Sequence, residues 1–199
     1  MNSAKTAIMV DSGCDISQEF IEQYDIKVLR LKVLYGDRMY SDGLDIDPLE
    51  VYRRFPQEIP TTSTPNMYEV SELVNEIKSE GYEKIIGITI SSGLSGTYNA
   101  VAMAFEEEDI ETFAFDTKNI SIGAGLLAMW AAKKLSEGWT FEAVKHGLND
   151  KINDSTYYLF LARIELFSKH GSSPSSTDVT IPPASSTIKI GRASCRERV

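Results

Sequence analysis

Short apolar runs alternate with segments of helical hydrophobic spacing along most of the chain. The apolar runs predict buried strands at Thr6–Val10, Lys84–Ile90, Glu111–Phe115 and Tyr157–Ala162. The segments between them repeat apolar residues three and four positions apart, which predicts amphipathic helices. Strands that alternate with helices of this length are typical of a parallel sheet with helices on both faces. The expected fold class is therefore α/β.

Capping signals mark the ends of several predicted helices. They are Ser17, Asp47–Pro48, Asn66 with Glu69, and Thr140 at N-termini, and Gly81 and Gly138 at C-termini. The segment Ile26–Tyr35 alternates apolar residues with Lys and Arg, which predicts one strand with a solvated face. Gly36–Asp37 then predicts a hairpin turn that returns through Arg38–Tyr40.

Polar turns follow three of the predicted strands. They contain Asp11–Ser12, Ser91–Ser92 and Asp116–Thr117. Because the carboxyl ends of parallel strands share one edge of the sheet, and ligands bind beyond that edge, we expect these turns to line one site. The hydroxyl-rich run Thr61–Thr64 is a fourth candidate for the same rim.

The segment Ile88–Tyr98 carries the most informative of these turns. It predicts a strand end, a glycine-rich loop and a helix start, which together bring backbone N–H groups and the positive end of a helix dipole to one point. Its Ser and Thr side chains add hydroxyls without charge, so the turn suits an anionic group held by neutral donors. Local chemistry alone favours the simpler interpretation that these hydroxyls cap the helix.

Composition narrows the class of protein. The 199 residues are 42% hydrophobic and 25% charged, as in a soluble globular protein of one or two domains. The net charge of -9 argues against nucleic acid as a partner, because phosphate binding needs a basic face. No apolar stretch is long enough for stable membrane insertion, and Met1–Lys5 lacks the features of a signal peptide. We therefore expect a cytoplasmic location.

The character of the sequence changes near its C-terminus. Residues 171–188 show neither helical nor strand periodicity, and residues 189–199 match a translation of a common sequencing-library adapter. We expect an N-terminal domain at 1–160, a remnant of a second domain at 161–170, and a non-native or disordered tail at 171–199.

Several catalytic chemistries lack the residues they need. The nucleophile-elbow pattern around Ser95 fails because Thr97 replaces its second glycine. The two histidines, His146 and His170, are expected at the surface, and no Gly-Lys-Ser/Thr phosphate loop is present. A small-molecule hydrolase or phosphotransfer enzyme that uses Asp11 or Ser95 nevertheless remains an alternative.

Three other interpretations are weaker. A metal site at Cys14, Asp11 and Asp15 has no second pair of ligands, and Cys14 is more simply a small buried residue. Gly123 and Gly125 only weakly suggest a dinucleotide loop. A regulatory interaction module could use the acidic run at residues 106–109, although such runs are usually solvated helix ends.

Several segments, taken in order, resemble the DegV family, which includes the fatty-acid-binding subunits of bacterial fatty acid kinase. They are Val10–Asp15, Asp42–Gly43, Pro60–Ser63, Ile90–Tyr98, and Asp116–Thr117 followed by Ser121, Gly123 and Gly125. The resemblance covers residues 5 to about 135. It implies a two-domain α/β protein that buries an acyl chain between its domains. After Phe160 the match stops, so most of the second α/β domain is expected to be missing.

The resemblance also implies a site and partners. A threonine and a serine hold the fatty acid carboxylate, and they map onto Thr62 and Ser92, with Thr61 as the fallback. The supporting loop residues are Ser91, Gly93, Ser95, Gly96, Asp11 and Ser12. The implied ligand is a long-chain fatty acid, with no metal or other cofactor. A partner kinase phosphorylates the bound carboxylate, so this subunit itself is not an enzyme.

Overall fold

The computed structural model describes residues 2, 4–55, 57–152, 157–160 and 187–190. The elements follow in the order β1 (Thr6–Asp11), the 3-10 turn η1 (Ser12–Cys14), α1 (Gln18–Tyr24), β2 (Lys27–Leu29), β3 (Lys32–Tyr35), β4 (Arg38–Ser41), α2 (Pro48–Arg54), β5 (Thr61–Ser63), α3 (Met67–Ser79), β6 (Lys84–Thr89), α4 (Thr97–Glu106), β7 (Glu111–Asp116), α5 (Ile122–Ser136), α6 (Phe141–Lys151), β8 (Tyr157–Phe160) and β9 (Thr187–Ile190).

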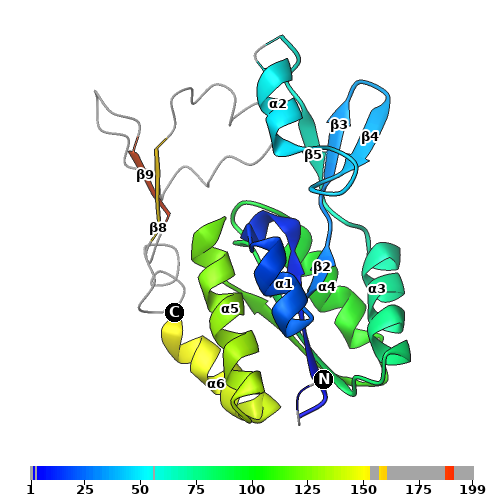
Figure 1. The fold of residues 1–199 in the computed structure, drawn as a ribbon, viewed down its shortest axis with the longest axis vertical. Helices are drawn as coiled ribbons and strands as arrows, with labels where there is room; N and C mark the ends of the chain where they lie inside the picture. The colour runs from blue at the N-terminus through cyan, green and yellow to red at the C-terminus, as the bar shows by residue number, and fades with distance from the viewer. Residues whose placement is uncertain (1, 3, 56, 153–156, 161–186, 191–199) are drawn as a thin grey trace, which may run out of the picture.

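A four-stranded parallel sheet in the order β2-β1-β6-β7 forms the centre of the fold. Helices α1, α5 and α6 pack on one face of this sheet, and α3 and α4 pack on the other (Figure 1). The prediction of an α/β fold with helices on both faces is confirmed.

The central strands are buried on both faces. Ile8, Ile88 and their neighbours pack against α5 and α6, whereas Met9 and Ile85 pack against α3 and α4. Each of these side chains is at most 4% exposed. A strand buried on both faces needs a nearly continuous apolar run, which is why the strand positions could be predicted from the sequence.

A smaller antiparallel sheet, β4-β3-β5, stands with α2 beyond the carboxyl ends of the central strands (Figure 1). The prediction of a single strand over Ile26–Tyr35 was wrong, because β2 belongs to the central sheet and β3 to the smaller one. Between them, the N–H of Leu31 donates to Ser12 Oγ at 3.1 Å. The alternation of apolar and charged residues continues from β2 into β3, although the two strands belong to different sheets.

The predicted helix caps are present. The side chains of Ser17, Asp47 and Thr140 each accept a backbone N–H of the first helical turn, and Asn66 with Glu69 forms the capping box of α3. Gly81 and Gly138 follow α3 and α5 with φ of 90° and 92°, a conformation that favours glycine.

The predicted domain boundaries fall mostly outside the described residues. The strand predicted at Tyr157–Ala162 is described as far as Phe160 and pairs antiparallel with Thr187–Ile190, which lies in the predicted tail. The division into 1–160, 161–170 and 171–199 stays a prediction. None of the described helices is long and apolar enough to cross a membrane.

Tyr35 leads to a prediction about stability. Its side chain is 8% exposed, and its buried hydroxyl finds no hydrogen-bond partner in the part of the chain that the structure describes. We expect Tyr35→Phe to raise the free energy of unfolding by about 1 kcal/mol, because it removes an unsatisfied polar group and keeps the ring. Urea denaturation measures this change.

Tyr40 provides the matched control, because its hydroxyl interacts with the guanidinium of Arg54. Tyr40→Phe should therefore leave stability unchanged or lower it. A loss of stability in Tyr35→Phe would show that the Tyr35 hydroxyl has a partner in solution.

Candidate functional site

The turns after β1, β6 and β7 meet at the carboxyl edge of the central sheet. The Asp11 carboxylate at the end of β1 accepts the Ile90 N–H at 2.8 Å. Asp116 at the end of β7 accepts the Ser92 N–H at 3.1 Å. The backbone that follows β6 is therefore held by an aspartate on each side.

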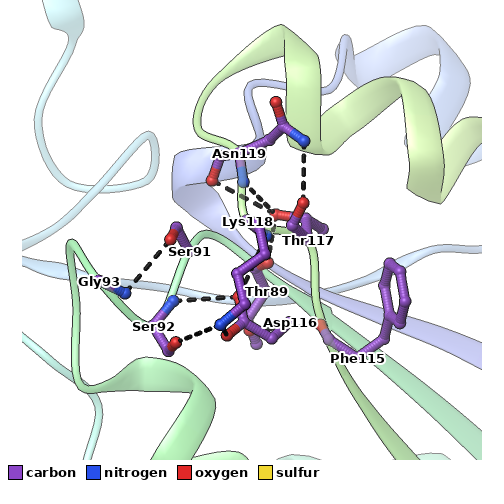
Figure 2. A network of polar contacts seen from close by, with 9 residues as sticks. All are labelled: Thr89, Ser91, Ser92, Gly93, Phe115, Asp116, Thr117, Lys118 and Asn119. Atoms are coloured by element: carbon purple, nitrogen blue, oxygen red, sulfur yellow. Dashed lines mark hydrogen bonds and ion pairs between the residues drawn. The ribbon is translucent and has the colours of Figure 1, made fainter. Parts of the chain in front are cut away.

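A network of hydrogen bonds links the turns after β6 and β7 (Figure 2). The Ser91 N–H donates to the Asn119 carbonyl at 2.7 Å, and the Gly93 N–H donates to Ser91 Oγ at 3.2 Å. The Thr117 hydroxyl donates to the Thr89 carbonyl at 2.8 Å. Ser91, Thr117 and Asn119 are all buried, so their polar groups serve the scaffold. Ser92 and Ser95 are partly exposed in this turn.

A lysine that sequence reasoning missed lies against Ser92. Lys118 Nζ donates to Ser92 Oγ at 3.0 Å and to Asp116 Oδ2 at 2.5 Å (Figure 2). The turn itself carries no charged side chain, but a lysine from the next turn lies beside it. Residue 118 lies 26 positions after Ser92, and only the pairing of β6 with β7 and a turn with φ of 53° at Lys118 bring it there.

The N-terminus of α4 adds backbone donors. Ser95 precedes the N-cap residue Gly96. Its Oγ accepts the Thr97 N–H at 3.2 Å and lies 2.8 Å from Thr97 Oγ1, so Ser95 satisfies the first N–H of this helix. Within the described part of the chain, the N–H groups of Tyr98 and Asn99 have no hydrogen-bond partner. Unpaired N–H groups at the positive end of a helix dipole favour an anion.

The hydroxyl run at residues 61–64 lies beside this helix start. A Cβ built on Gly96 would lie 3.7 Å from the Thr64 side chain. Thr61 and Thr62 are exposed on β5, where Thr62 pairs with Val33. No hydrogen bond joins either threonine to the Ser92 turn among the described residues. Since side chains alternate along a strand, Thr61 and Thr62 point to opposite faces of the small sheet.

Asp11 and Ser12 support the turn from the side of β1. Asp11 is 1% exposed, and burial raises its pKa to about 6. Burial likewise raises the pKa of the Cys14 thiol, so this cysteine is a poor nucleophile. Ser12 accepts the Leu31 N–H and thereby anchors the connection to the smaller sheet.

Asp42–Gly43 lies at the junction of the two sheets. Together with the β1 turn and Arg30, these residues line a cavity of about 220 Å³. Arg30 Nη1 donates to the Asp42 carbonyl at 2.7 Å, and Gly43 has a φ of 66°. Asp42 and Gly43 therefore fix the backbone conformation where the two sheets meet.

The alternative interpretations find little support in the geometry. Ser95 is engaged with the first N–H of α4, and His146 pairs with Asp150 on α6 with 81% of its side chain exposed. His170 lies outside the described residues. In the acidic run at 106–109, Glu108 and Asp109 pair with Lys78 of α3. Among the described residues, no three His, Cys, Asp or Glu side chains are grouped so that they could hold a metal ion.

Gly125 has a packing role that replaces the dinucleotide interpretation. A Cβ at this position would lie 2.3 Å from the Cys14 carbonyl oxygen, closer than any side chain allows. Glycine therefore lets the start of α5 contact the turn that carries Asp11 and Cys14.

Comparison with known proteins identifies the family. A family model described as "Uncharacterised protein, DegV family" matches residues 5–189. The chain therefore belongs to the DegV family, as its motifs indicated.

Relatives and solved structures agree with this assignment. A DegV domain-containing protein of Clostridium acetobutylicum is 38% identical over 157 residues, which are 78% of this chain and 56% of the relative. A fatty acid-binding protein of Thermotoga maritima is 32% identical over 77% of this chain and 54% of its own length. The structure of DegV from Bacillus subtilis, described as a fatty acid binding protein, superposes with a TM-score of 0.79 at 27% identity and covers 86% of this chain and 61% of its own. The chain spans about half the length of the curated relatives it matches.

The raised pKa of Asp11 predicts a dependence of stability on pH. The folded protein keeps the Asp11 proton up to about pH 6, whereas the unfolded chain releases it near 3.8. The folded state binds the extra proton, so stability falls as pH rises through this window. We expect the free energy of unfolding to fall by about 1 kcal/mol, relative to Asp11→Asn, from about pH 5 to about pH 7.5.

Urea denaturation of the unaltered chain and of Asp11→Asn at each pH gives this difference in the free energy of unfolding. The contributions of the other titrating groups are the same in both proteins and cancel. A difference that stays constant with pH, or that rises, would show that Asp11 is ionised throughout.

Proposed function

We propose that this chain binds a long-chain fatty acid and holds its carboxylate at the turn after β6. The observation that carries the proposal is the setting of Ser92. Its hydroxyl oxygen already accepts a hydrogen bond from Lys118, so its own proton is free to donate to a ligand. The names of the related proteins, two of them described as fatty acid binding, support the same ligand.

Around Ser92, the expected donors suit a carboxylate. The Tyr98 and Asn99 N–H groups lie at the start of α4. Thr62, on β5 of the smaller sheet, is the proposed second hydroxyl, with Thr61 as the fallback. Such donors hold an anion through charge-assisted hydrogen bonds. The loop residues Ser91, Gly93, Ser95, Gly96, Asp11 and Ser12 keep the donors in place.

Apolar side chains near the same edge offer surface for the acyl chain. Ile122 and Leu126 on the first turns of α5 are 50% and 58% exposed, and Leu49 at the start of α2 is 58% exposed. Covering a methylene group stabilises a complex by about 0.8 kcal/mol, so an acyl chain supplies most of the affinity.

The proposal includes presentation of the ligand to a partner kinase in the cytoplasm. The group in contact with the Ser92 hydroxyl is Lys118, which donates to the Ser92 oxygen and pairs with Asp116, and this arrangement favours a role in holding substrate. Incubation of the loaded chain with such a kinase and ATP should yield an acyl phosphate, which hydroxylamine traps. Acyl phosphate formed from free fatty acid at the same rate without the chain would contradict presentation.

Ligand retention tests the binding role. Organic extraction and mass spectrometry of the purified chain should release a fatty acid, and Ser92→Ala should weaken its affinity about tenfold through loss of one hydrogen bond to a charged group. Ser136→Ala, at the far end of α5, is the matched control and should retain wild-type affinity.

The threonines distinguish the two candidate donors. Thr62→Val should weaken binding as Ser92→Ala does, whereas Thr61→Val should not, because the two side chains point to opposite faces of the strand. The reverse result would move the role to Thr61. A folded preparation that contains no lipid and binds none would rule out the proposed function.

A further inference from the structure

Lys118 is the cationic group that lies in contact with Ser92. Its ammonium is held by Ser92 Oγ at 3.0 Å and by Asp116 Oδ2 at 2.5 Å, and 41% of its side chain is exposed (Figure 2). The chain as a whole carries a net charge of -9, which disfavours the approach of an anion. The Lys118 ammonium is more exposed than the Asp116 carboxylate that pairs with it, so the open side of the turn presents positive charge.

Counting donors shows that the ammonium has capacity left. A lysine ammonium has three N–H donors. Two of them are directed to Ser92 and Asp116, and within the described residues the third has no partner. A carboxylate that accepts the Ser92 hydroxyl proton can therefore also accept the remaining N–H of Lys118.

Asp116 fixes this arrangement. Its Oδ1 accepts the N–H groups of Ser92 and Lys118, each at 3.1 Å, while its Oδ2 accepts the ammonium. The Asp116 side chain is 10% exposed, so its position is set by the sheet edge. The backbone of Lys118, with a φ of 53°, turns the side chain back over Ser92.

We propose that Lys118 determines the specificity of this site for an ionised carboxylate over a neutral headgroup, an inference that rests on the proposed function. The ammonium acts in two ways. It attracts the carboxylate directly, and it occupies an acceptor position of Ser92 Oγ so that the hydroxyl donates outward. A fatty alcohol of the same length gains the acyl-chain contacts and can still accept the Ser92 proton, but it loses the attraction between opposite charges.

Isothermal titration calorimetry with myristic acid and myristyl alcohol, each below its aggregation limit, tests the proposal. We expect the unaltered chain to prefer the acid, and Lys118→Met to reduce that preference about tenfold with little change for the alcohol. Lys118→Arg keeps the charge and should keep most of the preference. Lys133→Met removes an exposed lysine of α5 and controls for net charge.

Salt dependence gives a second measurement. As ionic strength rises, the affinity for the acid in the unaltered chain should fall relative to that in Lys118→Met, because salt screens the partly exposed ammonium, while alcohol binding should not change. An acid preference that survives in Lys118→Met would overturn the role of Lys118 and leave the proposed function standing. Failure of the unaltered chain to bind either compound would overturn both.

Discussion

Two aspartates on neighbouring strands hold the turn on which the rest of the site depends. Asp11 accepts the Ile90 N–H from the side of β1, and Asp116 accepts the Ser92 N–H from the side of β7. Both hydrogen bonds require β6 to lie between β1 and β7, and the strand order of the central sheet places it there. The central sheet therefore sets the position of Ser92, and the exposed loop contributes little of its own.

Electrostatics at this edge combines a buried carboxylate with a partly exposed ion pair. Asp11 is buried and carries a raised pKa, so its role is structural and costs stability when it ionises. Asp116 instead pairs with Lys118, which leaves a cation facing solvent beside a hydroxyl donor. Asp11 therefore supports the scaffold at the end of β1, whereas Asp116 orients a partly exposed cation at the end of β7.

Local sequence patterns predicted most of the fold but only part of the site. Buried runs, caps at Ser17 and Asn66, and the polar turns each have a short-range physical cause that one segment reveals. The break between β2 and β3 could not be predicted, because alternating polarity fits either sheet. Lys118 was missed for a similar reason, since its contact with Ser92 depends on strand order and not on spacing. The roles of Thr61 and Thr62 stay predictions.

We propose that a fatty acid carboxylate binds at the Ser92 turn. A crystal structure of the chain with a long-chain fatty acid is the decisive test, because it locates both ends of the ligand. We expect a carboxylate oxygen within hydrogen-bond distance of Ser92 Oγ and of the Lys118 ammonium. A carboxylate bound elsewhere, with Ser92 still paired only to Lys118, would contradict it.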